Sequence, residues 1–297
     1  MRALITGATG LLGRHLLDRL DGAVVLSRDP DRARARLGTK VTAYRWTADD
    51  AAPPGDAFDG VDAVFHLAGE PVGERWTEAR KRRIRQSRTA GTRSLVAAIT
   101  SSPRPPTVLV SASAVGYYGD RGDEILDENA TAGSDFLAEV CREWEAEALR
   151  ARYHGLRVVT MRTGIVLARD GGALPRMLPP FRLGLGGRLG DGRHWMPWVH
   201  VDDVVGMMLL AARSTALDGP MNAVGPDPVR NTEFTRALGH VLHRPVALPV
   251  PRVALSLLFG EMSQILFASQ RALPRAAERA GYTFTHPDVG GALQSCV

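Results

Sequence analysis

The chain has 297 residues, of which 44% are hydrophobic, and carries a formal net charge of +5. This length is sufficient for one large domain, or for one domain with a smaller lobe, to bury a sizeable core. No apolar run approaches the ~20 residues that cross a bilayer, and the N-terminus lacks signal-peptide features, so we expect a cytoplasmic protein. The two cysteines, Cys141 and Cys296, have no metal-ligand spacing, which argues against a disulfide framework.

Short apolar runs alternate with amphipathic stretches through the first half of the chain. We predict strands at 2–6, 23–27, 62–68, 107–113 and 156–162, and helices at 11–20, 77–99 and 136–152. Near-continuously apolar strands that alternate with helices indicate a parallel sheet covered on both faces. The predicted fold is therefore α/β, a Rossmann-type doubly wound parallel sheet.

The second half of the chain is less regular. Residues 171–198 are rich in glycine, proline and arginine, so we expect loops and short elements that form a pocket lid there. Helices are predicted at 202–212, at 232–242 and after Arg252. We assign 1–162 to a dinucleotide-binding domain to which 199–225 returns, and 163–297 mainly to a small C-terminal substrate lobe.

A glycine-rich turn follows the first predicted strand, in the stretch LITGATGLLGRHLL. Glycines allow a tight turn and let backbone N–H groups approach a pyrophosphate, while the start of a helix attracts negative charge. The spacing is GxxGxxG rather than GxGxxG, but its place between a strand and a helix is the context that such a site requires. The residues predicted to bind a dinucleotide are Gly7, Thr9, Gly10, Leu11, Leu12 and Gly13.

The end of the second predicted strand indicates which dinucleotide is bound. A carboxylate there would bond the ribose 2′-hydroxyl of NAD, but Ser27 and Arg28 occupy this place. An arginine can pair with a 2′-phosphate through charge-assisted bonds, so we predict NADP(H) as the cofactor. The alternative is that Arg28 is a solvated charge and that Asp29 bonds the 2′-hydroxyl.

Four motifs, TGATGLLG, FHLAGE, VLVSASAVGYYG and PWVHVDD, occur in an order that resembles the extended short-chain dehydrogenase/reductase superfamily, which includes nucleotide-sugar epimerases. With FLAEVCREWEAEA and PFRLGLGG, the chain resembles its atypical branch of "epimerase family" proteins. The resemblance implies a Rossmann-type NADP-binding domain with a small substrate lobe. By position it implies cofactor contacts at Leu67, Ala68, Gly69, Arg88 and Val166, and a substrate-binding hydroxyl at Ser113.

The sequence departs from the superfamily at its proton donor. Most members carry a Tyr-x-x-x-Lys pair on the helix after the serine strand, where the lysine lowers the tyrosine pKa. Phe136 and Val140 stand at these positions, and phenylalanine cannot donate a proton. Our hypothesis is that Tyr117, held near Ser113, is the donor. The alternative is that Tyr117 and Tyr118 pack or stack without transferring a proton.

Other polar clusters have simpler explanations. His194, His200, Asp202 and Asp203 have no familiar metal-ligand spacing, so we predict no metal; the aspartates would cap the following helix and His200 would bond across the lobes. The basic run at 80–85 lacks interleaved aromatics, so we expect no nucleic acid. Trp144 and Glu145 are interpreted as helix packing and a surface charge.

A substrate pocket with aromatic and basic residues is a further hypothesis. The candidates are Trp76, Trp195, Trp198, Arg182, Arg188 and Arg193. Arginines at a pocket would favour an anionic small molecule, whereas the alternative is that the tryptophans pack and the arginines are solvated.

Two functions remain open at this point. The first is an NADP(H)-dependent oxidoreductase or epimerase-like enzyme that moves hydride to or from a substrate held by Ser113. The second is a catalytically silent NADP(H)-binding regulatory or scaffold protein. We expect a monomer or homodimer that does not bind membranes.

Overall fold

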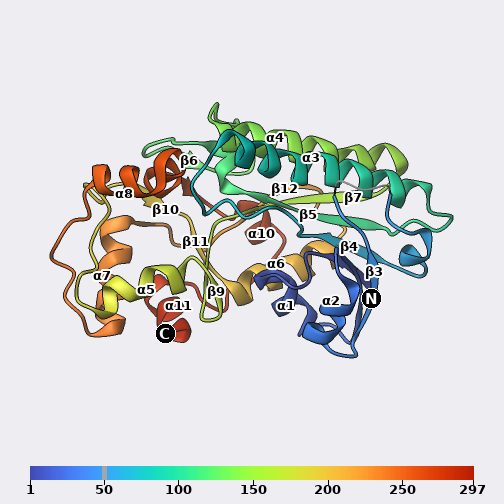
Figure 1. Ribbon diagram of the computed structural model, residues 1–297, viewed down its shortest axis with the longest axis horizontal. Helices are drawn as coiled ribbons and strands as arrows, with labels where there is room; N and C mark the ends of the chain where they lie inside the picture. The colour runs from blue at the N-terminus through green and yellow to red at the C-terminus, as the bar shows by residue number, and fades with distance from the viewer. Residues whose placement is uncertain (49–51) are drawn as a thin grey trace.

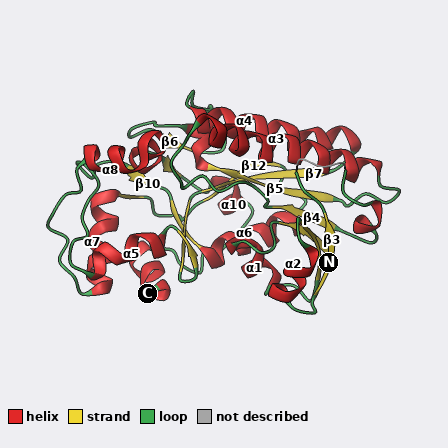
Figure 2. Ribbon diagram, viewed as in Figure 1, coloured by secondary structure: helices red, strands yellow, loops and turns green. Residues whose placement is uncertain are grey.

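The computed structural model describes residues 1–48 and 52–297. A seven-stranded sheet forms the centre of the molecule, and all of its neighbouring strands are parallel (Figures 1 and 2). In spatial order its strands are β12 (Gly219–Ala223), β7 (Arg157–Thr163), β5 (Val108–Ala114), β4 (Ala63–His66), β1 (Ala3–Thr6), β2 (Ala23–Ser27) and β3 (Val41–Arg45). The predicted Rossmann-type α/β class is confirmed.

The strand order reverses at β1. From β1 the chain builds outward through β2 and β3, and then crosses back to add β4 and β5 on the other side. In open α/β sheets, ligands bind at such a switch point, outside the carboxyl ends of the strands. The fold therefore predicts a ligand-binding site at the loops after β1, β4 and β5.

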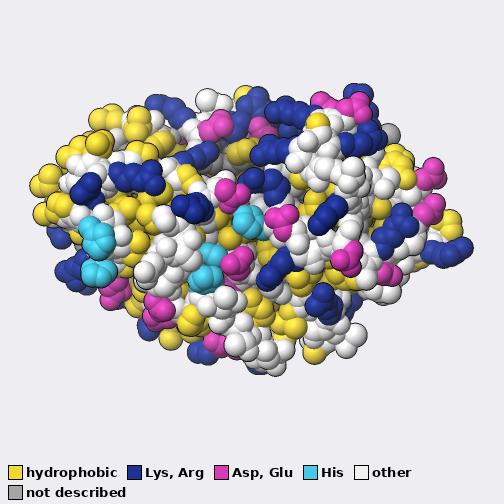
Figure 3. Space-filling view, turned by 90° about the horizontal axis from the view of Figure 1, so that it is seen from below, with side chains coloured by type: hydrophobic (Ala, Val, Ile, Leu, Met, Phe, Trp, Pro, Cys, Tyr) yellow, Lys and Arg dark blue, Asp and Glu magenta, His cyan; other side chains and the backbone are white. Residues whose placement is uncertain are grey.

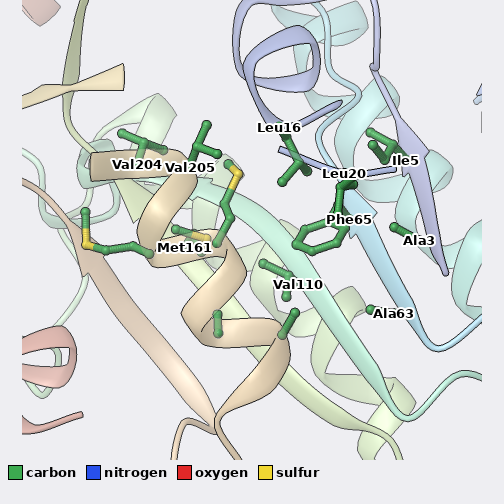
Figure 4. Packing of buried hydrophobic residues seen from close by; sticks show 14 of the residues in the cluster. Ala3, Ile5, Leu16, Leu20, Ala63, Phe65, Val110, Met161, Val204 and Val205 are labelled. Carbon is green, nitrogen blue, oxygen red and sulfur yellow. The ribbon is translucent and has the colours of Figure 1, made fainter. Parts of the chain in front are cut away.

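Helices cover both faces of the sheet (Figure 1). The helices α3 (Glu78–Ser101) and α4 (Phe136–Leu149) lie on one face, and α1 (Leu11–Leu17), α2 (Pro30–Leu37) and α6 (Val201–Arg213) lie on the other. Successive strand residues point to opposite faces. On β1, Leu4 accordingly packs with the apolar side chains of α3, whereas Ile5 packs with those of α1 and α6 (Figure 4).

Most of the remaining elements form a smaller lobe beside the sheet. The others connect this lobe to the sheet. The helices of the lobe are α5 (Leu174–Arg182), α7 (Asn231–Leu242), α8 (Arg252–Phe259), α9 (Gln264–Phe267) and α11 (Val289–Cys296), whereas α10 (Arg275–Arg279) packs against β12 of the central sheet. The short strands outside the central sheet are β6 (Ile125–Leu126), β8 (Ile165–Ala168), β9 (Gly171–Gly172), β10 (Trp195–Met196), β11 (Trp198–His200), β13 (Val229–Arg230) and β14 (Arg271–Ala272). None of the helices in the described ranges is long and apolar enough to cross a membrane.

The stretch 171–198 consists of loops and short elements, as predicted, and α5 is the longest of these elements. Leu174, Leu178 and Phe181 recur at helical spacing and bury one face of α5. Pro179 and Pro180 lie inside the helix, where proline removes a backbone donor. The apolar spacing thus permits a short helix despite the proline content.

We predict that Gly13→Ala destabilises the protein by about 1–3 kcal/mol, the usual cost of overpacking. A Cβ at Gly13 would lie 2.5 Å from the Ala8 Cα atom, which is backbone and cannot move aside locally. Urea unfolding measures the change. Gly55→Ala is the matched control, because nothing lies within 4 Å of its added carbon. Equal stability of Gly13→Ala and wild type would contradict this account of the turn.

Candidate functional site

The predicted glycine loop forms a tight turn against the end of β4. Gly7 has φ +73°, and a Cβ there would lie 2.8 Å from the Leu67 carbonyl carbon. The Gly10 N–H donates to the Gly7 carbonyl at 3.0 Å, and no side chain caps the start of α1 at Gly10. The first backbone N–H groups of a helix have no partner within it, so those of α1 are available to a bound anion.

A buried histidine fixes the two loops of the switch point relative to each other. The Thr6 Oγ1 atom accepts the N–H groups of Leu67 and Ala68, each at 3.1 Å, and lies 2.7 Å from His66 Nδ1. His66 Nε2 lies 2.9 Å from Thr92 Oγ1 on α3. Burial, with a smaller effect of the Arg88 charge, lowers the pKa of His66 to about 4, so the ring is neutral at pH 7.

Most of the predicted cofactor residues lie at the carboxyl edge of the central sheet. Ser27 ends β2, the glycine loop follows β1, and Leu67–Gly69 follow β4. Ser113 is on β5 near its carboxyl end, and Val166 is on β8. Because carboxyl ends of parallel strands meet at the same edge, this arrangement suits an extended dinucleotide.

Arg88 lies beside this edge as a cation without a carboxylate partner among the described residues. A Cβ atom added at Gly69 would lie 3.2 Å from the central carbon of the Arg88 guanidinium. The same carbon lies 5.0 Å from the centroid of the Trp144 ring. Its Nη1 donates to the Glu70 and Ile84 carbonyls, at 3.0 and 3.1 Å. Burial lowers the pKa of Arg88, because the charged form loses hydration there. An anionic ligand near Gly69 would compensate this charge.

Ser113 belongs to a buried ionic network. Its hydroxyl donates to Glu145 Oε1 at 2.6 Å, and Arg162 binds both carboxylate oxygens of Glu145 at 2.9 Å. Ser113, Glu145 and Arg162 are 5%, 6% and 3% exposed. Burial disfavours a charged guanidinium, but the bonds to Glu145 outweigh this effect and raise the pKa of Arg162.

The interpretation of Glu145 as a surface charge is therefore wrong. Along α4, Ala138, Cys141 and Ala148 are buried at helical spacing, and Glu145 occupies the same stripe. A carboxylate within an apolar stripe needs a buried partner. The position of Glu145 in this apolar stripe was the signal in the sequence that it is buried. Its partner Arg162 lies on β7 and could not be identified from residue spacing.

The two tyrosines after β5 have different surroundings within the 3₁₀ helix η2 (Val115–Tyr118). Tyr118 is buried; its hydroxyl donates to Asn222 Oδ1 at 2.7 Å and accepts from Arg162 Nη1 at 3.0 Å. Tyr117 is half-buried and stacks its ring 3.5 Å from the Arg162 guanidinium. Within the described ranges, the Tyr117 hydroxyl forms no hydrogen bond, and Ser113 pairs with Glu145 instead.

The residues at the positions of the superfamily's tyrosine and lysine are apolar, and so are their surroundings. Phe136 packs edge-on against Trp76, with ring centroids 5.2 Å apart, and Val140 is fully buried. Both join a cluster with Ile84 and Met262. This side of α4 supplies packing and contributes no proton donor at these positions.

The pocket tryptophans pack within the protein. Trp76 and Trp198 are buried, and the Trp198 Nε1–H donates to the Asp227 carbonyl. Trp195 has Arg230 and Arg271 over its ring, at 4.6 and 4.5 Å from its centroid. These contacts favour the packing alternative. Arg182, Arg188 and Arg193 are exposed.

The expected helix cap also requires correction. The N-cap of α6 is His200, whose Nδ1 accepts the Asp202 N–H at 3.1 Å. Asp203 lies in the first turn, and its carboxylate accepts the N–H groups of Thr285 and His286. The expected bond across the lobes is present, since His200 Nε2 lies 3.2 Å from Ser295 Oγ on α11.

Sheet order and glycine turn together define a Rossmann-type α/β protein of the extended short-chain dehydrogenase/reductase kind. Residues 3–224 match the NAD dependent epimerase/dehydratase family, and residues 250–296 match a domain of unknown function, DUF1731. The chain belongs to the NAD dependent epimerase/dehydratase family, which confirms the resemblance seen in the sequence.

Three known proteins illustrate the similarity. The chain is 41% identical to "Epimerase family protein SDR39U1 homolog, chloroplastic" of Arabidopsis thaliana, over 99% of this chain and 86% of the relative. It matches the crystal structure of human epimerase family protein SDR39U1 with NADPH at TM-score 0.88 and 32% identity, over 100% and 99% of the two chains. UDP-glucose 4-epimerase of Thermotoga maritima, at TM-score 0.79 and 18% identity over 100% and 97%, shares the fold alone.

We predict that Glu145→Gln lowers the free energy of unfolding by about 3–5 kcal/mol, since it leaves Arg162 charged and buried without a counter-charge. Urea unfolding at pH 7 measures the loss. In the control Glu143→Gln, on the same helix, the lost partner is the half-exposed Arg85, and such pairs contribute at most about 1 kcal/mol. Similar losses in the two variants would show that the buried pair is not a major constraint.

The His66 pKa predicts a pH dependence of stability. Its value falls from 6.5 to about 4 on folding, so this contribution is complete above pH 6.5 and is lost as the pH falls towards 4. At about 1.4 kcal/mol per pH unit, the loss is about 3 kcal/mol. Urea unfolding of His66→Gln between pH 6.5 and 4 should lack this component. The exposed His154→Gln control should retain it; an unchanged slope in His66→Gln would refute the assignment.

Proposed function

We propose that the protein is an NADP(H)-dependent oxidoreductase, or an epimerase-like enzyme, that acts on a small carbonyl or alcohol substrate. The observation that carries the proposal is the Ser113–Glu145 hydrogen bond next to a dinucleotide-binding edge. Human SDR39U1, which is similar over the whole chain, was crystallised with NADPH. The shared fold supports the same cofactor here.

The described residues fit NADP(H). The close approach of Gly7 and Gly13 to neighbouring backbone leaves no room for side chains at the turn, as a bound pyrophosphate requires. Arg28 is exposed and has no ion-pair partner within the described ranges, so it is free to pair with a 2′-phosphate. The alternative partner, Asp29, caps α2 by accepting the Arg32 N–H at 3.0 Å. These contacts support Arg28 as the discriminating residue.

Ser113 and Glu145 would then move the substrate proton. The cofactor, when bound, supplies or accepts the hydride. The Ser113 hydroxyl donates to Glu145, which Arg162 binds through both carboxylate oxygens, so a lone pair of Ser113 Oγ can accept a substrate hydroxyl. In alcohol oxidation, the substrate proton passes to Ser113 Oγ as the Ser113 proton passes to Glu145; reduction reverses both transfers.

Tyr117 has a different role in this proposal from the one first considered. Its ring covers Arg162, which supports a role in positioning the ionic network rather than in proton donation. Catalysis that survives Tyr117→Phe would agree with this role. A tenfold or greater loss with an intact Ser113–Glu145 pair would restore Tyr117 as the donor.

The second candidate is a silent NADP(H)-binding regulatory protein. Two observations favour it: the apolar cluster at Phe136 and Val140, and the near-complete burial of Ser113. A screen of carbonyl substrates with NADPH, using Ser113→Ala as the control, separates the candidates. Turnover that depends on Ser113 supports the enzyme, and NADPH binding without turnover supports the silent protein.

Calorimetric titration with NADPH, NADP⁺ and NADH tests the cofactor. We expect NADPH to bind at least about tenfold more tightly than NADH, a difference of about 1.4 kcal/mol. Arg28→Ala should remove this preference, whereas Arg36→Ala, which changes an exposed arginine in the last turn of α2, should keep it. If none of the three nucleotides binds, the proposed function fails.

A further inference from the structure

Two segments that are distant in the sequence bring two histidines and an aspartate together. His200 precedes α6, Asp202 lies in its first turn, and His286 lies in the loop before α11. One potential ligand atom from each residue lies within 4.8 Å of the others. Figure 3 shows histidine and acidic side chains next to each other near the middle of this face of the molecule. The cluster is separate from Ser113 and from the residues of the proposed mechanism.

The distances suit a small divalent cation. Asp202 Oδ2 lies 3.5 Å from His200 Nδ1 and 3.5 Å from His286 Nε2. In a tetrahedral site with bonds of about 2.0–2.1 Å, ligand atoms are about 3.3 Å apart. The two imidazole rings lie with centroids 3.7 Å apart and with an angle of 35° between their planes, and each ring has one nitrogen 3.5 Å from the same carboxylate oxygen.

The hydrogen bonds of His200 favour the tautomer that a metal ligand needs. The Ser295 hydroxyl donates to the Ala292 carbonyl at 2.8 Å, so at 3.2 Å it accepts the His200 Nε2–H. The lone pair is then on Nδ1, on the side of Asp202. Ligating histidines commonly donate their other N–H in this way. The Asp202 N–H also reaches this Nδ1, at 3.1 Å, so a metal would compete with one helix-cap bond.

The loop that carries His286 is held in place independently of any metal. Asp203 accepts the backbone N–H of His286 at 3.0 Å, the N–H of Thr285 at 2.8 Å and the Tyr282 hydroxyl at 3.0 Å. The Asp202 side chain is 48% exposed, which leaves a solvent side for entry and for a fourth ligand. The three protein ligands are therefore preorganised around one open position.

From this geometry we propose that His200, Asp202 and His286 bind one divalent transition-metal ion of the zinc class, with solvent as the fourth ligand. Two imidazoles and one carboxylate are a ligand set of borderline softness that suits Zn²⁺ or Co²⁺ better than Mg²⁺ or Ca²⁺. The ion joins the start of α6, which covers the central sheet, to the loop before the C-terminal helix. It acts as a clamp between these segments.

The test uses tag-free, chelator-treated full-length protein titrated with Zn²⁺ against a chromophoric indicator, and with Co²⁺ by visible absorption. We expect one Zn²⁺ per chain and the intense bands of four-coordinate Co²⁺. Asp202→Asn is the decisive variant, because it keeps the backbone N–H of the helix cap and alters a half-exposed side chain. It should weaken Zn²⁺ binding by at least about tenfold, as should His286→Ala.

His240→Ala is the matched control, because His240 is an exposed histidine outside the cluster and should leave Zn²⁺ binding unchanged. Ser295→Ala should weaken binding about tenfold by releasing the His200 ring. Absence of stoichiometric Zn²⁺ binding in wild type would overturn the proposal. Binding of equal strength in wild type, Asp202→Asn and His286→Ala would overturn it as well.

Discussion

The buried ion pair between Arg162 and Glu145 is the interaction on which the centre of the molecule depends. Removing two charges from water is costly, and the cost is offset only when every polar atom finds a partner. Here Nε and Nη2 of Arg162 bind Glu145, while Nη1 binds the Tyr118 hydroxyl and the Glu128 carbonyl. The pair thereby ties β7 to α4 and to the segment after β5. Its geometry fixes the orientation of Ser113.

The same pair relates the fold to the proposed chemistry. Where the superfamily places a tyrosine on the outer turn of α4, this chain places Phe136 in an apolar cluster. The carboxylate of Glu145 lies more than two turns further along the same helix and reaches the serine from within the protein. A proton acceptor held by a buried arginine is preorganised, because the proton can be transferred without a prior movement of any side chain. In the proposed mechanism, this chain thus has the serine of the superfamily, but the serine is paired with Glu145 instead of a tyrosine.

Sequence patterns predicted the local features of the protein better than its long-range contacts. The glycine turn, the apolar strands and the alternation with helices are local, and they sufficed for the fold class; the dinucleotide-binding residues stay a prediction. Two strands of the central sheet, β3 and β12, were not predicted. The sequence of β12, GPMNA, has no β-branched residue, and this strand is stabilised by pairing with β7. The role of Glu145 depends on Arg162, and the position of His286 depends on Asp203. Such pairs form only when distant segments meet, so spacing along the chain cannot reveal them.

The central claim is that a dinucleotide bound along the carboxyl edge of the sheet brings its nicotinamide to the Ser113–Glu145 pair. A crystal structure of the complex with NADP⁺ tests this most directly. The account predicts the pyrophosphate at the backbone of Gly10–Gly13, the 2′-phosphate at Arg28, and the nicotinamide between Val166 and Ser113, with Ser113 still bonded to Glu145. A nicotinamide that faces away from Ser113, or a cofactor bound elsewhere, would contradict it.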